Sequence, residues 1–154
     1  GPKRQAQLRG QWLGFVFQES LLLPDLTLWE NCRLAVNLAG RPWDETKIRD
    51  KFVELMEMLG LDPDRSNHMP AQLSTGQRQR VAVVRALIHE PKLIFADEPT
   101  GNLDNESSEK LLDLLLPLVN EHDAGIIVAT HDPVMAQSIK ENYYLEDCKL
   151  KKGS

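Results

Sequence analysis

Cysteine is scarce in this chain, and no stretch of it stays apolar for long. Its two cysteines, Cys32 and Cys148, lie far apart and outside any C-x-x-C pattern. That spacing argues against a disulfide framework or a zinc site and favours a reducing environment. No apolar run approaches the roughly 20 residues of a membrane-spanning helix. The first residues also lack the apolar core of a signal peptide.

An excess of positive charge is missing as well. The 154 residues carry a formal net charge of −5 at pH 7, which gives no support to a nucleic-acid partner. The composition is 42% hydrophobic and 27% charged, which is typical of a globular protein and not of a disordered one. The length is enough for one domain with a core of its own.

A third absence concerns glycine. The loop that cradles nucleotide phosphates follows the pattern G-x-x-x-x-G-K-[ST]. No two of the nine glycines are five residues apart with lysine following the second. The sequence therefore contains no such loop, and this absence affects the interpretation of the motifs below.

Short apolar runs alternate with helical patterns along the chain. The runs are predicted to be buried strands, at residues 13–18, 93–97 and 125–130. Weaker strands are predicted at 143–146 and 149–151. Apolar strands that alternate with helices indicate an α/β fold with a parallel sheet. Residues 21–38 are mixed in character, with a turn at Pro24, and residues 61–72 read as a loop.

The predicted helices are marked by capping residues. The first covers residues 44–59, with Asp44 as the N-cap and Gly60 at the end. The second begins after Ser74 and ends before Pro91. A third runs from 105 or 106 to 121, and Pro117 should kink it or end it early. A short fourth helix opens at Asp132-Pro133.

The densest group of polar motifs lies between Leu73 and Asp104, which reads LSTGQRQRVAVVRALIHEPKLIFADEPTGNLD. A serine at a helix N-terminus, with a glycine that permits close backbone approach, makes an anion site because free amides and the helix dipole face the anion. Asp97 and Glu98 follow four apolar residues, at the carboxyl end of a predicted strand. Taken alone, each motif also fits an ordinary helix cap or strand end, but the continuous run favours a functional interpretation.

Two further residues complete the pattern. Gln18 ends the predicted strand LGFVF, and His131 follows the strand GIIVAT. The remaining histidines have no such context and receive no role; they are His68, His89 and His122. The basic residues of the second helix are interpreted as a solvated face, since the chain is acidic overall; they are Arg78, Arg80 and Arg85.

This order of motifs resembles the ATP-binding cassette (ABC) ATPases, from about Leu13 to Lys151. The segments FVFQ, LLPDLTLWEN and EPTGNLD are most similar to the branch that serves lipoprotein release, macrolide export and cell-division transporters. The family couples ATP hydrolysis to work by a membrane permease. The resemblance implies Mg²⁺ and ATP as cofactors, a permease and a second ATP-binding subunit as partners, no nucleic acid, and a cytoplasmic position at the inner face of the membrane.

The resemblance also assigns roles to residues. It implies that Asp97 holds Mg²⁺ with Gln18 nearby, and that Glu98 polarises the attacking water while His131 reaches the γ-phosphate. The signature residues Ser74, Thr75, Gly76 and Gln77 would contact ATP held by a partner subunit, and Thr75 stands where the family usually has glycine. Asn102 to Asp104 would form the loop that crosses the dimer interface.

The missing phosphate loop leads to expectations about fold and activity. The chain is expected to be one incomplete, N-terminally truncated P-loop NTPase (RecA-like) domain without its P-loop strand. Residues 19–90 would form a helical subdomain, in which residues from about 19 to 72 are the face that docks on the permease. Residues 11–18 and 91–154 would form the rest of the α/β core. In the family, the P-loop strand lies beside the strand that precedes His131. Strand 125–130 should therefore have an open apolar edge, leading to self-association, element swapping, or repair by strand 143–146.

Three functional alternatives stay open at this point. The chain could be an ABC ATPase module that binds Mg-ATP weakly and does not hydrolyse it usefully alone, because a P-loop supplies most of the grip on phosphate. It could be a non-catalytic partner that donates its signature motif to another subunit's P-loop or docks on a permease. It could also be a folded fragment without function.

Overall fold

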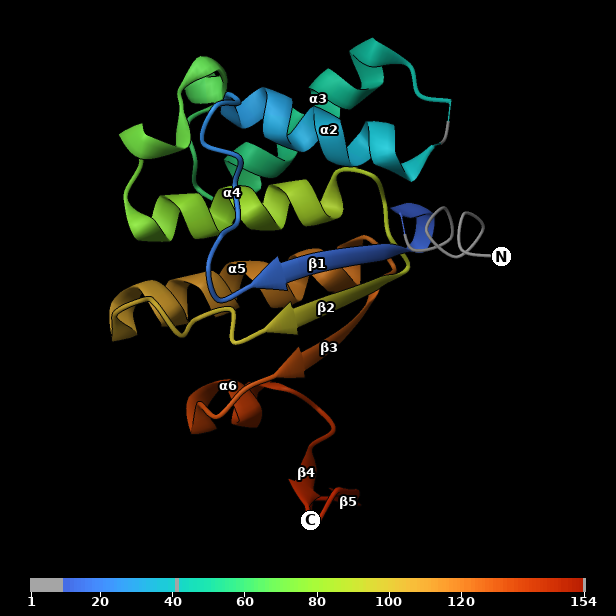
Figure 1. The fold of residues 1–154 in the computed structure, drawn as a ribbon, viewed down its shortest axis with the longest axis vertical. Coiled ribbons are helices and arrows are strands. Elements are labelled where there is room, and N and C mark those ends of the chain that lie inside the picture. The colour runs from blue at the N-terminus through green and yellow to red at the C-terminus, as the bar shows by residue number, and fades with distance from the viewer. Residues whose placement is uncertain (1–9, 41, 154) are drawn as a thin grey trace.

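A parallel sheet organises the molecule in the computed structural model, which describes residues 10–40 and 42–153. Its strands are β1 (Leu13–Phe17), β2 (Leu93–Asp97) and β3 (Gly125–Ala129), in the spatial order β1-β2-β3. Figure 1 shows the helices α2, α3 and α4 stacked beyond β1 and the helix α5 behind the sheet. The predicted α/β class with a parallel sheet is confirmed.

The register of the sheet brings the carboxyl ends of the three strands together. Phe17 pairs with Asp97, and Asp97 pairs with Ala129. The residues that follow these positions in the sequence therefore lie together at the carboxyl ends of the strands. Open parallel sheets usually bind their ligands at this end.

The segment between β1 and the signature is helical. It contains α2 (Leu28–Ala39), α3 (Glu45–Met58) and two short 3-10 turns, η1 (Pro63–Asn67) and η2 (Pro70–Gln72). Asp44 caps α3 as predicted, and Gly60 adopts a φ of 63° after its end. The sequence interpretation missed α2, which begins with a capping box between Thr27 and Glu30.

Helix α4 (Thr75–Leu87) connects the helical segment to the sheet. Ser74 caps it, as predicted, and its apolar face is fully buried. The helix approaches β1 so closely that a Cβ at Gly14 would lie 2.5 Å from the carbonyl oxygen of Ala86. Only glycine permits this contact between the strand and the helix.

Helix α5 (Asn105–Glu121) continues through Pro117, so the predicted early end is wrong. Proline leaves the carbonyl of Asp113 without its helical donor, but both residues are exposed and water can satisfy it. Buried leucines on both sides of the proline hold the two halves of the helix against the core; they are Leu111, Leu112, Leu115 and Leu118.

The C-terminal part comprises α6 (Pro133–Ser138), capped by Asp132, and a hairpin of β4 (Tyr143–Glu146) and β5 (Lys149–Lys152). Asp147 and Cys148 both have positive φ, 49° and 59°, as a tight two-residue hairpin turn requires. Because β4 pairs with β5, it does not repair the edge of the three-stranded sheet, and that predicted option is wrong. Ile127 on β3 is 52% exposed. Within the described ranges, no helix is long and apolar enough to cross a membrane.

Candidate functional site

The carboxyl ends of the strands place Gln18, Asp97, Glu98 and His131 at one edge of the sheet. Glu98 leaves β2 with a φ of 45°, and its backbone N–H donates to the carbonyl of Ala129 at 2.8 Å. A non-glycine residue in this region of backbone space is uncommon and is often found at functional sites. The turn directs the Glu98 side chain across β3.

Glu98 and His131 form the tightest polar contact of this edge. One carboxylate oxygen of Glu98 accepts from the His131 backbone N–H at 3.0 Å and lies 2.7 Å from its Nδ1. The hydroxyl of Thr130 donates to the other oxygen at 3.2 Å. The hydrogen bond and the charge of Glu98 raise the pKa of His131. His131 is 84% exposed on its side chain and Glu98 23%, so the histidine is the outer member of the pair.

Gln18 and Asn102 are joined although they are far apart in the sequence. The Gln18 Nε2 donates to the Asn102 Oδ1 at 3.2 Å, and the Asn102 Nδ2 donates to the Gln18 backbone carbonyl at 3.2 Å. A Cβ at Gly101 would lie 2.8 Å from the Gln18 Nε2, so this glycine lets the two loops meet.

The donor set for a metal ion is small. Asp97 is exposed and its carboxylate makes no hydrogen bond or ion pair within residues 10–40 and 42–153. Gln18 donates through its nitrogen, which leaves its amide oxygen to accept. One carboxylate and one amide suit Mg²⁺, which usually binds few protein groups together with phosphate oxygens and water. The described residues contain no cluster of three or more His, Cys, Asp or Glu that would hold a metal alone.

The four signature residues form a separate group at the start of α4. The Ser74 hydroxyl accepts from the Gln77 N–H at 3.2 Å, and the Gln77 carboxamide accepts from the Ser74 N–H at 2.9 Å. The amides of Thr75 and Gly76 occupy the first turn of the helix, where backbone donors have no partner within the helix. Among described residues, no hydrogen bond joins this group directly to the strand-end residues.

Asp104 serves as a helix cap. Its carboxylate accepts from the Ser107 N–H at 2.8 Å at the start of α5, and this bond lowers its pKa. Gly76 faces the same turn, since a Cβ there would lie 3.6 Å from the Ser107 hydroxyl. Asp104 therefore caps the same turn that the signature helix approaches.

Sequence reasoning missed Gln79, which connects the two groups. Its side chain is buried, and its Nε2 donates to the Phe17 carbonyl at 2.7 Å and to the Pro99 carbonyl at 2.9 Å. The signal was present, because Gln79 lies three and four residues before Ala82 and Val83 on the apolar face of α4.

The interpretation of the α4 arginines as a solvated face is wrong. All three side chains are half-buried and donate to backbone carbonyls: Arg78 to Leu73 at 2.6 Å, Arg80 to Leu59 at 3.0 Å and Arg85 to Leu21 at 2.6 Å. The bonds of Arg80 and Arg85 join α4 to the end of α3 and to the loop after β1, and thereby fix the helical segment to α4.

The comparison with known families agrees with the arrangement of these motifs. The profile of the family described as ABC transporter matches residues 2–101. The chain belongs to the ABC transporter family. The predicted membership, and the similarity to its lipoprotein-release branch, are confirmed.

Relatives of this ABC chain include two ATP-binding proteins of lipoprotein-releasing systems. The LolD protein of Legionella pneumophila (strain Lens) is 42% identical over 148 residues, which cover 96% of this chain and 64% of that protein. The LolD protein of Shewanella oneidensis is 45% identical over 148 residues, covering 93% and 63%. The chain thus spans less than two thirds of these relatives.

Solved ABC cassettes have the same fold. A dimeric post-hydrolysis state of the cassette MJ0796, bound to ADP and Pi, superposes with a TM-score of 0.83 at 35% identity, covering 99% of this chain and 67% of that one. CbiO1 from Clostridium perfringens superposes with a TM-score of 0.85 at 25% identity, covering 99% and 61%.

Proposed function

We propose that this chain is part of the ATP-binding subunit of a lipoprotein-release type transporter, peripheral at the inner face of the membrane. In that role it would couple ATP hydrolysis to work by a permease. The observation that carries the proposal is the Glu98–His131 pair at the end of the sheet, 2.7 Å apart, beside an unpaired Asp97. A carboxylate and a histidine at adjoining strand ends suit the orientation of a water against a phosphoryl group.

Each residue of the edge has a separate task in this proposal. Asp97 and the Gln18 amide oxygen would hold Mg²⁺, which neutralises phosphate charge when bound. Glu98 would accept a hydrogen bond from the attacking water. His131 would donate toward the phosphate, and Thr130 and the His131 backbone would keep the Glu98 carboxylate in place.

We infer further that the chain alone binds Mg-ATP weakly and lacks useful ATPase activity, since it contains no glycine-rich phosphate loop. Calorimetry with Mg-ATP on the chain and on Glu98→Gln tests this directly. We expect calorimetry to show no Mg-ATP binding in the micromolar range, and a phosphate-release assay to show no ATP hydrolysis above background. Turnover by the chain that disappears in Glu98→Gln would contradict the inference and restore an autonomous enzyme.

A second candidate function is donation of the signature helix to a second cassette. It is supported by the exposed first turn of α4, where the amides of Thr75 and Gly76 lack helical partners. The test adds this chain to a complete LolD cassette and measures its ATPase rate. Stimulation that is lost in Ser74→Ala, but kept in Ser138→Ala, would support donation. No effect of the wild-type chain would instead favour a folded fragment without function.

Residues from about 19 to 72 are the proposed docking face for the permease. They belong to a helical subdomain of residues 19–90, and residues 11–18 and 91–154 form the rest of the proposed core. An apolar groove of about 520 Å³ supports this docking proposal; it lies between β1, the following loop and α2. Its lining includes Phe15, Phe17, Leu21, Leu23, Leu34 and Leu38. A permease segment with an apolar face would fill such a groove.

The open edge of β3 supports self-association as a further proposal. Ile127 is 52% exposed on a strand whose outer backbone groups have no strand partner within the described ranges. Unpaired strands pair readily with another chain. A second ATP-binding cassette is also an expected partner, since the similar cassette MJ0796 has been solved as a dimer.

A further inference from the structure

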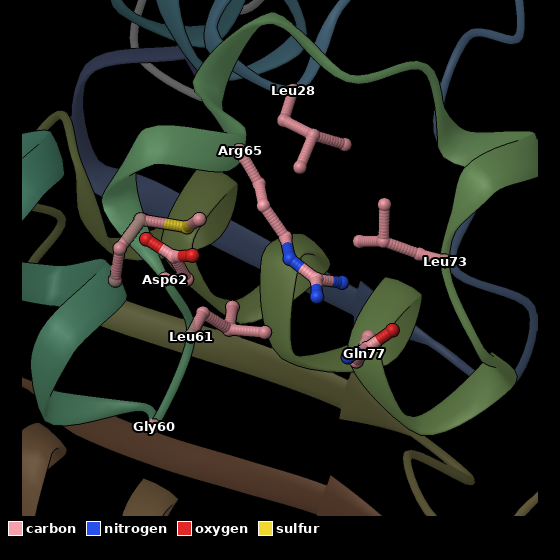
Figure 2. A pocket seen from close by; sticks show the side chains of 8 residues that line it. Leu28, Gly60, Leu61, Asp62, Arg65, Leu73 and Gln77 are labelled. Atoms are coloured by element: carbon pink, nitrogen blue, oxygen red, sulfur yellow. The ribbon is translucent and has the colours of Figure 1, made fainter.

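The hairpin of β4 and β5 leaves its apolar side chains in solvent. Leu145 and Leu150 are 74% and 72% exposed, and Tyr143 is 54% exposed. By contrast, Leu28 and Leu73 line a small pocket of the helical part in Figure 2 and are 0% and 5% exposed. A two-stranded hairpin by itself is only marginally stable in water. This hairpin therefore needs a further strand or a surface to pack against.

The hairpin stands apart from the three-stranded sheet. Strands β4 and β5 form a sheet of their own, and Figure 1 shows it beyond β3, at the end of a connection that contains α6. Among the strands that the structure describes, none pairs with the outer edge of β3 or with the free edge of β4. The molecule thus has one sheet with an open edge and one hairpin without a sheet to join.

Both sheets carry a row of apolar side chains that runs across their strands. In the three-stranded sheet, Phe15 pairs with Phe95 and Phe95 pairs with Ile127, so the three side chains lie on one face. Phe15 and Phe95 stack with ring centroids 5.8 Å apart, but Ile127 ends the row and is 52% exposed. In the hairpin, Leu145 pairs with Leu150. If β4 lay beside β3 with Leu145 next to Ile127, the two rows would become one.

Charge protects one of the free edges and not the other. Lysine on an edge strand discourages pairing with another chain. Strand β5 has the sequence KLKK, with lysine at three of its four residues. Strand β3 has the sequence GIIVA and no charged residue. Addition of the hairpin to β3 through β4 would cover the unprotected edge and leave the lysine-rich edge of β5 outermost.

We propose that a second copy of this chain supplies the hairpin, so that β4 of each copy adds to β3 of the other. Within one copy the hairpin is not paired with β3. Because each copy has one open edge and one free hairpin, the exchange is reciprocal and closes as a two-fold dimer. Residues 130–142 connect each exchanged hairpin to its own copy. This inference rests on the self-association proposed above, names the two segments that meet, and requires neither ATP nor a permease.

Mixing two variants tests the exchange. Ile127→Lys blocks the receiving edge and Leu145→Lys blocks the donated hairpin. Each variant alone should dimerise about tenfold or more weakly than the wild type in sedimentation velocity, since burial of an unpaired lysine is costly. In an equal mixture, the hairpin of the first variant meets the intact edge of the second, so the mixture should form more dimer than either variant at the same total concentration. Val134→Lys, at an exposed valine of α6, should dimerise like the wild type.

A nitroxide on Cys148 shows which copy the hairpin contacts. Cys148 is exposed at the hairpin turn and Cys32 is buried, so Cys148 takes the label in the native chain. The labelled chain, without isotope enrichment, is mixed with isotope-enriched Cys148→Gly, in which glycine suits the positive φ of this turn position. NMR should then show broadening of the β3 amides and none of the α3 amides.

The outcomes separate this inference from the other proposals. Broadening at β3 only when one chain carries both the nitroxide and the isotope would mean that the hairpin pairs within its own copy, and would overturn the exchange. A mixture that forms no more dimer than its components would also overturn it. Dimerisation of Leu145→Lys at the wild-type affinity would overturn the exchange but leave the open edge of β3 as the self-associating surface. A wild-type chain that stays monomeric would contradict self-association and the exchange together. Since no measurement involves ATP, the proposed ATP-binding role stands or falls separately by calorimetry.

Discussion

At the scale of single residues, the two cysteines differ sharply in their surroundings. Cys32 is fully buried in α2, and burial raises the pKa of its thiol to about 12. Cys148 is exposed at the hairpin turn. The thiolate is the reactive form of cysteine. We therefore expect iodoacetamide to label Cys148 first and Cys32 only after unfolding, as followed by mass spectrometry. Equal labelling rates in the native chain would mean that α2 is not packed as described.

His131 provides a second residue-scale prediction. Because the Glu98 hydrogen bond and charge raise its pKa, protonated His131 is stabilised in the folded state. This contribution is fully present below the ordinary pKa of about 6.5 and is lost as pH rises through the higher folded value. NMR titration should give a raised pKa for His131 in the wild type and a lower one in Glu98→Gln. Glu106→Gln, a carboxylate on α5, is the control that should leave it unchanged.

At the scale of elements, Gln79 joins α4 to the loops after β1 and β2. Gln79→Leu keeps the volume but leaves the carbonyls of Phe17 and Pro99 without their buried donor. We expect it to lower the free energy of unfolding by about 1–3 kcal/mol. Urea denaturation measures this, with Gln72→Leu, in an exposed turn, expected to cost less than about 1 kcal/mol. Equal effects in the two variants would show that the buried bonds contribute little.

The contact between α3 and the end of α5 should respond to acid. The Lys51 Nζ donates to the His122 Nδ1 at 3.4 Å, and burial together with the Lys51 charge lowers the pKa of His122. A lowered pKa favours the neutral ring in the fold, so its contribution to stability is present above about pH 6.5 and is lost as pH falls below it. Lys51→Met should raise the pKa of His122 in an NMR titration. An unchanged pKa would mean that burial alone causes the shift.

Local signals predicted most elements but not every helix. Asp44, Ser74 and the strand LIFAD gave their elements directly, because caps and short apolar runs act within a few residues. Helix α2 was missed because its cap, Thr27, follows a loop of apolar residues that masks the helical period. The early end predicted at Pro117 was wrong because this proline is exposed on α5, where the helix tolerates it. Its exposure depends on how the helix packs.

The candidate site was predictable as a set of residues and not as contacts. Glu98, His131, Gln18 and Asn102 were identified by motif, but the pairs they form depend on the sheet register and on the close approach at Gly101. The role of Gln79 depends on neighbours from distant segments. Sequence spacing alone does not contain that information.

At the scale of the whole molecule, the open edge of β3 carries a prediction about oligomeric state. A charged residue on an edge strand opposes pairing with another chain, so Ile127→Lys should lower self-association of the wild-type chain. Sedimentation velocity over a range of concentrations measures this. Val134→Lys on α6, where the native side chain has the same 52% exposure, is the matched control. A wild-type chain that stays monomeric at every concentration would contradict the proposed self-association.

The pairing of β1 with β2 also determines when the sheet can form during synthesis. Leu13 pairs with Leu93, and the entire helical segment lies between them. Strand β1 can therefore pair with β2 only after β2 has left the ribosome, while α2, α3 and α4 can assemble earlier. Parallel pairing over such a separation is slow because a long loop must close first. During that interval the strand LGFVF, with Phe15 and Phe17, stays exposed to aggregation and is a natural target for chaperones.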